Sequence, residues 1–177
     1  MKAVLAIDMQ KALINEQYDL GQRVKNMETV LEDFSNQNYP VFFMQHTSEN
    51  REDPFYIEGK GAEVYPPLKK YATEIIQKET PSAFYQTDLL EKCQAYKVDE
   101  LIIIGLNTEF CCLFTAIAAY DRGFKVVFIE DATATVNNGE VYEVSELDIP
   151  DFIGTVLHWS GSIDVLDMEE YKDWIQI

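Results

Sequence analysis

Short apolar runs alternate with helix-like patterns along most of the chain. Several runs are apolar at every position, which is typical of parallel strands that are covered on both faces. Between them, apolar residues recur at helical spacing with polar residues opposite, as in crossover helices. The predicted strands are residues 3–7, 41–44, 101–104, 126–129 and 163–166, and the predicted helices are 22–38, 88–96, 109–122 and 150–159. This alternation predicts an α/β protein with a parallel sheet, helices on both faces and right-handed crossovers.

The composition favours one folded, acidic domain over residues 1–177, with 47% apolar residues. A net charge of -17 disfavours nucleic acid and anionic membrane surfaces as partners. No apolar run approaches the ~20 residues of a membrane span, and the run after Lys2 is too short for a secretory leader. Three cysteines do not form a disulfide framework and match a reducing compartment, so we expect a cytoplasmic protein.

Residues 47–67 break the alternation of strands and helices. The segment is polar, contains prolines and glycines, and is longer than a compact domain needs for a connection. We interpret it as a lid, a subunit contact or an ordinary surface excursion.

The most informative segment is Gly105 to Cys112, directly after the apolar run 101–104. It predicts a strand that breaks at Gly105 and a helix capped by Thr108, with Cys111 in the first helical turn. Unpaired N–H groups and the helix dipole favour the thiolate there, and therefore a nucleophile. The alternative is that Cys111 and Cys112 are both small core residues.

Other reactive side chains follow the predicted strands. Asp8 follows the first strand, His46 the second, and Lys78 the short apolar pair at 75–76. In an open parallel sheet, ligands bind beyond the carboxyl ends of the strands, so these residues and Cys111 are expected to converge on one edge. Taken singly, Asp8 is also explained as a turn residue and Lys78 as a solvated charge.

Several motifs together resemble the isochorismatase-like cysteine hydrolase superfamily, which includes nicotinamidases and N-carbamoylsarcosine amidohydrolase. They are Asp8-Met9-Gln10, Lys78 with Ser82-Ala83-Phe84, Gly105-x-x-Thr108-x-x-Cys111, and the stretches at 61–63, 116–123 and 131–133. The resemblance covers nearly the whole chain. It implies a Rossmann-like three-layer α/β/α sandwich around about six parallel strands, and assembly into a homodimer or a higher homo-oligomer.

The resemblance also implies roles for individual residues. Cys111 is the nucleophile, Asp8 the carboxylate that takes and returns the thiol proton, and Lys78 the cation that stabilises both. The oxyanion donors are the backbone N–H groups of Asn107 and Cys111, beside a cis peptide bond between Leu106 and Asn107. The family spacing from Gly105 selects Cys111 over its neighbour Cys112, whose side chain diverges by about 100° on a helix.

A metal ion and any other cofactor are not expected. The nicotinamidase branch binds a zinc-like ion through an Asp-x-His pair and a further histidine, but Met44 stands where the aspartate would precede His46. The only other histidine, His158, is assigned to structure.

We expect the substrate pocket to involve Gln10, Leu13, His46, Phe84 and Phe110. A lone histidine such as His46 is more often a structural residue, and the alternative for Phe84 and Phe110 is that they belong to the core. Many relatives carry phenylalanine where this chain has Leu13, so the substrate cannot be transferred from them. True isochorismatases lack the cysteine nucleophile, and its presence here therefore indicates hydrolysis of an amide or carbamoyl C–N bond in a small molecule. Nicotinamidase-type activity and an inactive binding protein remain as alternatives.

Overall fold

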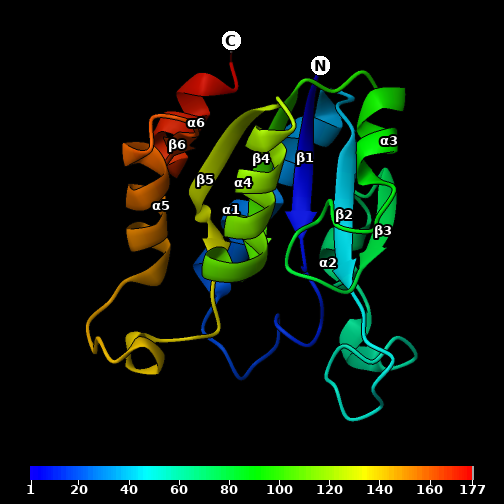
Figure 1. Cartoon of the computed structure of the whole chain (residues 1–177), viewed down its shortest axis with the longest axis vertical. Coiled ribbons are helices and arrows are strands. Elements are labelled where there is room, and N and C mark those ends of the chain that lie inside the picture. The colour runs from blue at the N-terminus through cyan, green and yellow to red at the C-terminus, as the bar shows by residue number, and fades with distance from the viewer. Residues whose placement is uncertain (177) are drawn as a thin grey trace.

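The fold is built on one parallel sheet, seen in a computed structural model that describes residues 1–176 (Figure 1). The strand order is β3-β2-β1-β4-β5-β6, and every neighbouring pair is parallel. This is the doubly wound order, and it confirms the predicted fold class. The strands are β1 (Lys2–Ile7), β2 (Val41–His46), β3 (Glu74–Lys78), β4 (Glu100–Leu106), β5 (Lys125–Ala134) and β6 (Asp164–Leu166).

Helices cover both faces of the sheet (Figure 1). Helices α1 (Gly21–Asn36) and α6 (Met168–Trp174) bury their apolar residues with one face of the central strands. Helices α3 (Leu89–Ala95), α4 (Leu113–Asp121) and α5 (Ile149–Trp159) bury theirs with the other face. The three-layer arrangement agrees with the predicted sandwich. Within residues 1–176, none of the helices combines the length and the apolarity that crossing a bilayer would require.

The apolar patterns correctly located the main helices. In α1 the buried side chains are Met27, Val30, Leu31 and Phe34, the residues whose spacing predicted the helix. Helix α6 was not predicted, because it has only seven residues and is mostly polar. Its one fully buried side chain is Tyr171, whereas Asp167 and Glu170 close a capping box at its start.

The segment between Gly105 and Cys112 differs from the prediction in two ways. Strand β4 continues through Gly105 to Leu106 instead of ending at the glycine. Thr108 does not cap a helix: Asn107 occupies the N-cap position, and residues Thr108–Cys112 form a π-helical turn before α4. The Thr108 hydroxyl instead meets that of Thr133 at 3.0 Å, a buried contact that competes with the cap.

Gly105 is required where β1 and β4 lie side by side. Its φ is +123°, and a Cβ atom there would lie 2.1 Å from the carbonyl oxygen of Ile7. Since Ile7 precedes Asp8 and pairs with Gly105, the glycine lets the two strand ends that carry the site approach each other.

Shorter elements fill the connections. Helix α2 (Pro66–Lys69) and the 3-10 turn Lys60–Ala62 lie in or next to the unusual 47–67 segment, and a second 3-10 turn spans Gly139–Tyr142. The 47–67 segment is therefore folded against the domain, with an isolated bridge between Gln10 and Val64.

Candidate active site

Asp8, Lys78 and Cys111 meet at the carboxyl ends of β1, β3 and β4. The Lys78 ammonium lies 2.8 Å from Asp8 Oδ2 and 3.3 Å from Cys111 Sγ. Both charged side chains of the pair are almost completely buried, with exposures of 0% for Lys78 and 3% for Asp8. The three residues are 70 and 33 positions apart in sequence, so only the sheet topology brings them together.

Strand register explains how these side chains are aimed. Lys78 is the last residue of β3 and pairs with His46, the last residue of β2. Asp8 directly follows β1 and has a left-handed backbone with φ of 47°, which turns the chain away from the strand direction. In the strand order, β1 and β4 flank the position where the winding reverses, which is the usual ligand-binding crevice of such sheets.

Electrostatics keep the Cys111 thiol protonated at rest. Burial and the nearby Asp8 charge raise the pKa of this thiol to about 12, although Lys78 opposes them. The expected effect of the helix terminus, which favours the thiolate, is therefore outweighed, because the thiol is largely buried and lies near the Asp8 carboxylate at the end of β1. Burial would lower the pKa of Lys78, but Asp8 and Cys111 outweigh it and raise that pKa, so the lysine remains charged.

The two carboxylate oxygens of Asp8 differ in their hydrogen bonding. Its Oδ2 is bound by Lys78, whereas Oδ1 is buried and accepts no hydrogen bond from residues 1–176. A buried acceptor without a donor is uncommon and needs an explanation. This oxygen is suited to receive a proton from a thiol beside the same lysine.

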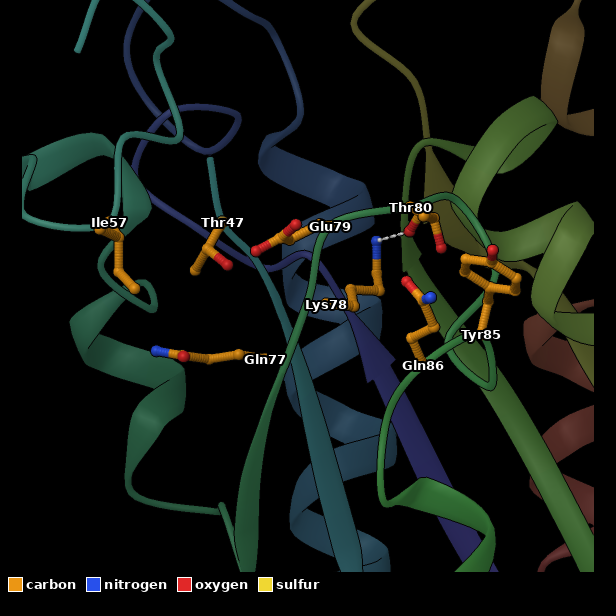
Figure 2. A pocket seen from close by; sticks show the side chains of 8 residues that line it. All are labelled: Thr47, Ile57, Gln77, Lys78, Glu79, Thr80, Tyr85 and Gln86. Atoms are coloured by element: carbon orange, nitrogen blue, oxygen red, sulfur yellow. Dashed lines mark hydrogen bonds between the residues drawn. The ribbon is translucent and has the colours of Figure 1, made fainter. Parts of the chain in front are cut away.

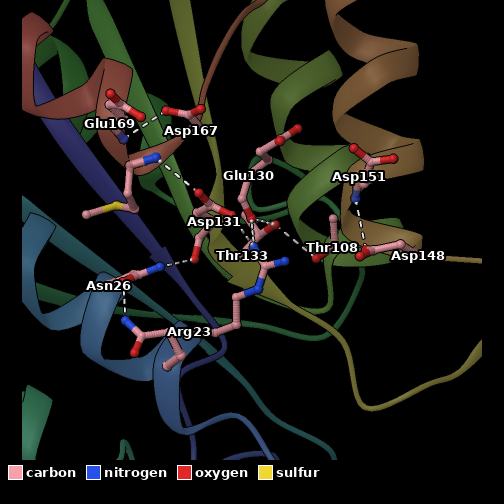
Figure 3. A network of polar contacts seen from close by, with 12 residues as sticks. Arg23, Asn26, Thr108, Glu130, Asp131, Thr133, Asp148, Asp151, Asp167 and Glu169 are labelled. Carbon is pink, nitrogen blue, oxygen red and sulfur yellow. Dashed lines mark hydrogen bonds and ion pairs between the residues drawn. The ribbon is translucent and has the colours of Figure 1, made fainter.

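The turn that carries Cys111 is fastened to the end of β5. The peptide bond between Leu106 and Asn107 is cis, and the Asn107 side-chain oxygen accepts a hydrogen bond from the Val136 N–H at 3.1 Å. Figure 3 shows the contact between Thr108 and Thr133 beside a network in which Arg23 binds the Glu130 carbonyl and the Asp131 carboxylate. These contacts join α1, β5 and the turn in one connected set.

Comparison with known proteins identifies the family. The family model described as Isochorismatase domain matches residues 2–155. The chain belongs to the isochorismatase family. The chain is 30% identical to Nicotinamidase 3 of Arabidopsis thaliana over 161 residues, which cover 83% of this chain and 79% of that protein.

Solved structures of isochorismatase-family proteins have the same fold. A cysteine hydrolase from Pseudomonas syringae pv. phaseolicola 1448A superposes with a TM-score of 0.86 at 22% identity, covering 99% of this chain and 92% of that one. The nicotinamidase PncA from Bacillus subtilis superposes with a TM-score of 0.78 at 24% identity, covering 93% and 98%. These superpositions show that the isochorismatase-family chain has the fold that the motifs implied.

Cys111 is the accessible thiol of this isochorismatase-family chain. Cys111 is partly exposed, whereas Cys93 and Cys112 are buried. Burial raises the pKa of Cys93 to about 12 and raises that of Cys112 well above its usual value. Cys112 also belongs to the core between the sheet and helices α3 to α5, as the sequence suggested.

His46 lies at the edge of the site as a neutral side chain. Its Nδ1 is 3.3 Å from the Lys78 ammonium, and its ring packs edge-on against Phe55 at 5.0 Å. Burial and the charge of Lys78 lower the pKa of His46, although Asp8 and other carboxylates oppose them. A neutral imidazole can accept from the lysine through Nδ1 and still has a second nitrogen for another partner.

The other residues expected in the substrate pocket lie in different surroundings. Gln10 is fully buried: its Nε2 donates to the carbonyls of His46 and Ala62, and its Oε1 accepts from the His46 N–H. The Gln10 amide therefore holds the backbone at His46 and Ala62 in place, and it has no free group for a ligand. Leu13 and Phe84 are buried in the two cores, with Phe84 stacked on Phe124, whereas Phe110 is 42% exposed.

A hollow of about 240 Å³ adjoins the site at Lys78 (Figure 2). Sequence reasoning singled out Lys78 among the residues that line it and missed the others. Two of them, Glu79 and Thr80, directly follow Lys78 at the end of β3. Ligands usually bind beyond the carboxyl ends of parallel strands, so this position was the signal in the sequence that could have identified them. The lining residues are Thr47, Ile57, Gln77, Lys78, Glu79, Thr80, Tyr85 and Gln86.

No group of three potential metal ligands among histidine, cysteine, aspartate and glutamate comes together within residues 1–176. Near the site, Met44 is buried in the sheet and His46 already faces an ammonium group. These residues do not fit a zinc-like ion, which takes several nitrogen, sulfur or carboxylate ligands.

Proposed function

We propose that this protein is a cysteine-dependent hydrolase that cleaves an amide or carbamoyl C–N bond of a small molecule. The observation that carries the proposal is the buried Lys78 ammonium in contact with both the Asp8 carboxylate and the Cys111 sulfur. This arrangement places a nucleophile, a proton acceptor and a fixed positive charge within reach of one another.

In the proposed reaction, Asp8 Oδ1 takes the thiol proton as Cys111 Sγ attacks the carbonyl carbon. Negative charge develops on the carbonyl oxygen and is stabilised by the backbone N–H groups of Asn107 and Cys111. The tetrahedral intermediate collapses, the C–N bond breaks, and Asp8 returns the proton to the leaving nitrogen. A water molecule, deprotonated by Asp8, then attacks the thioester, which releases the acid and restores the Cys111 thiol.

Lys78 supplies a fixed positive charge beside the two reacting groups. Its ammonium contacts the Asp8 carboxylate and the Cys111 sulfur, and it stabilises the thiolate as it forms. Since the resting thiol has a pKa of about 12, proton transfer to Asp8 accompanies the attack instead of preceding it.

The similarity to Nicotinamidase 3 and, at 31% identity over 110 residues, to the nicotinamidase of Escherichia coli supports nicotinamide as one candidate substrate. The alternative function is that of a catalytically inactive binding protein. The intact set of Asp8, Lys78 and Cys111 argues against it.

The test is ammonia release from a panel of primary amides and carbamoylated amino acids, including nicotinamide, without added metal. The wild-type protein is expected to hydrolyse at least one of them, and Cys111→Ala to hydrolyse none. A covalent acyl adduct on Cys111, seen by mass spectrometry after rapid quenching, would support the thioester. If no panel member reacts and iodoacetamide labels Cys111 no faster than Cys93, the hydrolase proposal fails.

We also infer that the protein works as a homo-oligomer in the cytoplasm. Support for the oligomer comes from the exposed apolar side chains of α4 and α5, because monomeric proteins rarely expose large apolar patches. These side chains are Phe114, Ile117, Tyr120, Phe152, Val156 and Trp159. Support for the cytoplasm comes from the three free cysteines, which suit a reducing compartment. Light scattering after gel filtration tests the oligomer, and replacing Phe114 and Trp159 by lysine is expected to yield monomers.

A further inference from the structure

We propose that the site selects its substrate by charge: the part of the substrate that occupies the hollow beside Lys78 is uncharged or cationic, and carboxylates and phosphates are disfavoured. This inference rests on the proposed function for the identity of the reacting group. It concerns the rest of the substrate, which neither the family membership nor the catalytic residues determine.

The first argument is that Lys78 has no N–H donor left for a ligand. Lys78 is the one cation among the residues that line the hollow. Its ammonium group contacts Asp8 Oδ2 at 2.8 Å, the Thr80 carbonyl at 3.1 Å and Cys111 Sγ at 3.3 Å. His46 Nδ1 competes for the same protons at 3.3 Å. An ammonium group has three N–H bonds, so these partners occupy all of them.

The second argument is that the charge of Lys78 is already balanced. The Asp8 carboxylate neutralises it within the buried pair. His46 adds no positive charge near neutral pH, because burial and Lys78 lower its pKa. An anionic ligand in the hollow would therefore lose water without gaining a charged partner.

The third argument is that the remaining charge around the hollow is negative. Glu79 lines it, and in Figure 2 its carboxylate extends toward Thr47. Asp53 and Glu79 both act on His46 at the edge of the site. The whole chain, at -17, adds a field of the same sign.

The uncharged lining suits a polar, compact group. Thr47, Gln77 and Gln86 bring hydroxyl and amide groups to the hollow, and Ile57 and Tyr85 bring apolar surface. Amide and hydroxyl groups can bind an ammonium, an amide or an alcohol through their oxygen atoms. The hollow thus combines hydrogen-bonding capacity with a net negative charge.

Charged thiol reagents test this selection without a substrate. They react with Cys111, whose sulfur lies 3.3 Å from the ammonium of Lys78, a residue that lines the hollow. Three methanethiosulfonates differ in the group they carry: methyl, trimethylammonioethyl or sulfonatoethyl. Each forms a disulfide with Cys111 and releases methanesulfinate, and each rate is divided by the rate with 2-mercaptoethanol to remove intrinsic reactivity. We expect the normalised cationic rate to exceed the anionic rate by about tenfold at low salt, and the ratio to shrink toward one at about 1 M salt.

Glu79→Gln and Glu32→Gln form a matched pair of variants. Both remove one negative charge, but Glu32 is an exposed residue of α1, outside the hollow. Glu79→Gln is expected to reduce the cationic-to-anionic ratio by about threefold, and Glu32→Gln to leave it nearly unchanged, since screening limits the reach of exposed charges. A ratio at or below one in the wild type, or equal effects of the two variants, would overturn the inference.

Turnover separates this inference from the proposed function. Butanamide, 4-aminobutanamide and succinamate have similar lengths and differ in charge at the end remote from the amide. If amides are hydrolysed and succinamate has the highest kcat/KM, the charge inference is wrong while the hydrolase proposal holds. If neither these amides nor the panel react and iodoacetamide labels Cys111 no faster than Cys93, the hydrolase proposal fails. The charge selection at Cys111 still holds in that case if the charged reagents show the expected order.

Discussion

Replacing Asp8 by asparagine is expected to make Cys111 more reactive toward alkylation while it abolishes hydrolysis. Lys78 Nζ lies 2.8 Å from Asp8 Oδ2 and 3.3 Å from Cys111 Sγ, so the carboxylate oxygen and the sulfur are at most about 6 Å apart. At that separation and an effective dielectric constant of about 20, two like charges repel by about 3 kcal/mol, which corresponds to about two pKa units.

The magnitude of the rate change follows from this pKa shift. Asp8→Asn lowers the Cys111 pKa from about 12 to about 10. At a pH below both pKa values, the thiolate fraction rises about 100-fold. A less basic thiolate is also less nucleophilic, and this lowers the rate per thiolate by about tenfold. Alkylation by iodoacetamide near pH 8 should therefore be about tenfold faster than in the wild type. Amide hydrolysis should fall by at least about 100-fold, since the base that becomes the acid is lost.

The assay is the labelling rate of the peptide that contains Cys111, followed by mass spectrometry, with Cys111→Ser as the blank. Lys78→Met should change the rate in the opposite direction. It removes a positive charge that lowers the thiol pKa, so it should slow alkylation. It also leaves Asp8 buried without a partner, which costs about 3–5 kcal/mol, so circular dichroism must first show that this variant is folded. If Asp8→Asn slows alkylation, or if both variants change the rate in the same direction, the electrostatic reasoning is refuted.

Three further predictions concern stability. Gly105→Ala should lower the free energy of unfolding by at least about 2 kcal/mol in urea titrations, because of the positive φ and the contact with Ile7, whereas Gly21→Ala, with nothing within 4 Å, should not lower it. The unfolding free energy should fall as pH drops below 6.5, because the lowered pKa of His46 means that the folded state binds its proton less readily than the unfolded state; His46→Gln should reduce this fall, and an unchanged pH dependence would contradict the assignment. Glu109→Leu should destabilise the fold by about 1–3 kcal/mol in thermal unfolding, because Thr135, Asn137 and Tyr142 all donate to Glu109 Oε1, and Glu109→Gln, which keeps that oxygen, should cost less.

Apolar periodicity predicted strands β1, β2, β4, β5 and β6 and the longer covering helices. It did not predict β3, whose apolar residues are limited to Ile75 and Ile76, or the mostly polar α6. Runs such as 101–104 are buried because both faces of β4 are covered, and this leaves a continuous apolar signature. The positions of Asp8 and Lys78 were also predictable, since each stands where an apolar strand ends. In these places local pattern and tertiary structure agree.

The parts that could not be predicted depend on contacts between distant segments. The Thr108 hydroxyl had a local use as a cap and a distant use with Thr133, and only the folded structure decides between them. The raised pKa of Cys111 depends on burial and on Asp8, which spacing along the chain does not reveal. Gln10 was expected near substrate, but its amide is occupied by the backbone of β2 and of the 47–67 segment.

The placement of the Cys111 turn and of the hollow has a consequence for how such a protein can change. Asp8 and Lys78 are attached to the rigid sheet, whereas much of the hollow is lined by connecting segments around residues 47, 57 and 79–86. Loops tolerate sequence change better than the strands they connect. New substrates can therefore be reached by exchanging these loops on an unchanged reaction centre, which makes them the positions to randomise when a library is built from this scaffold.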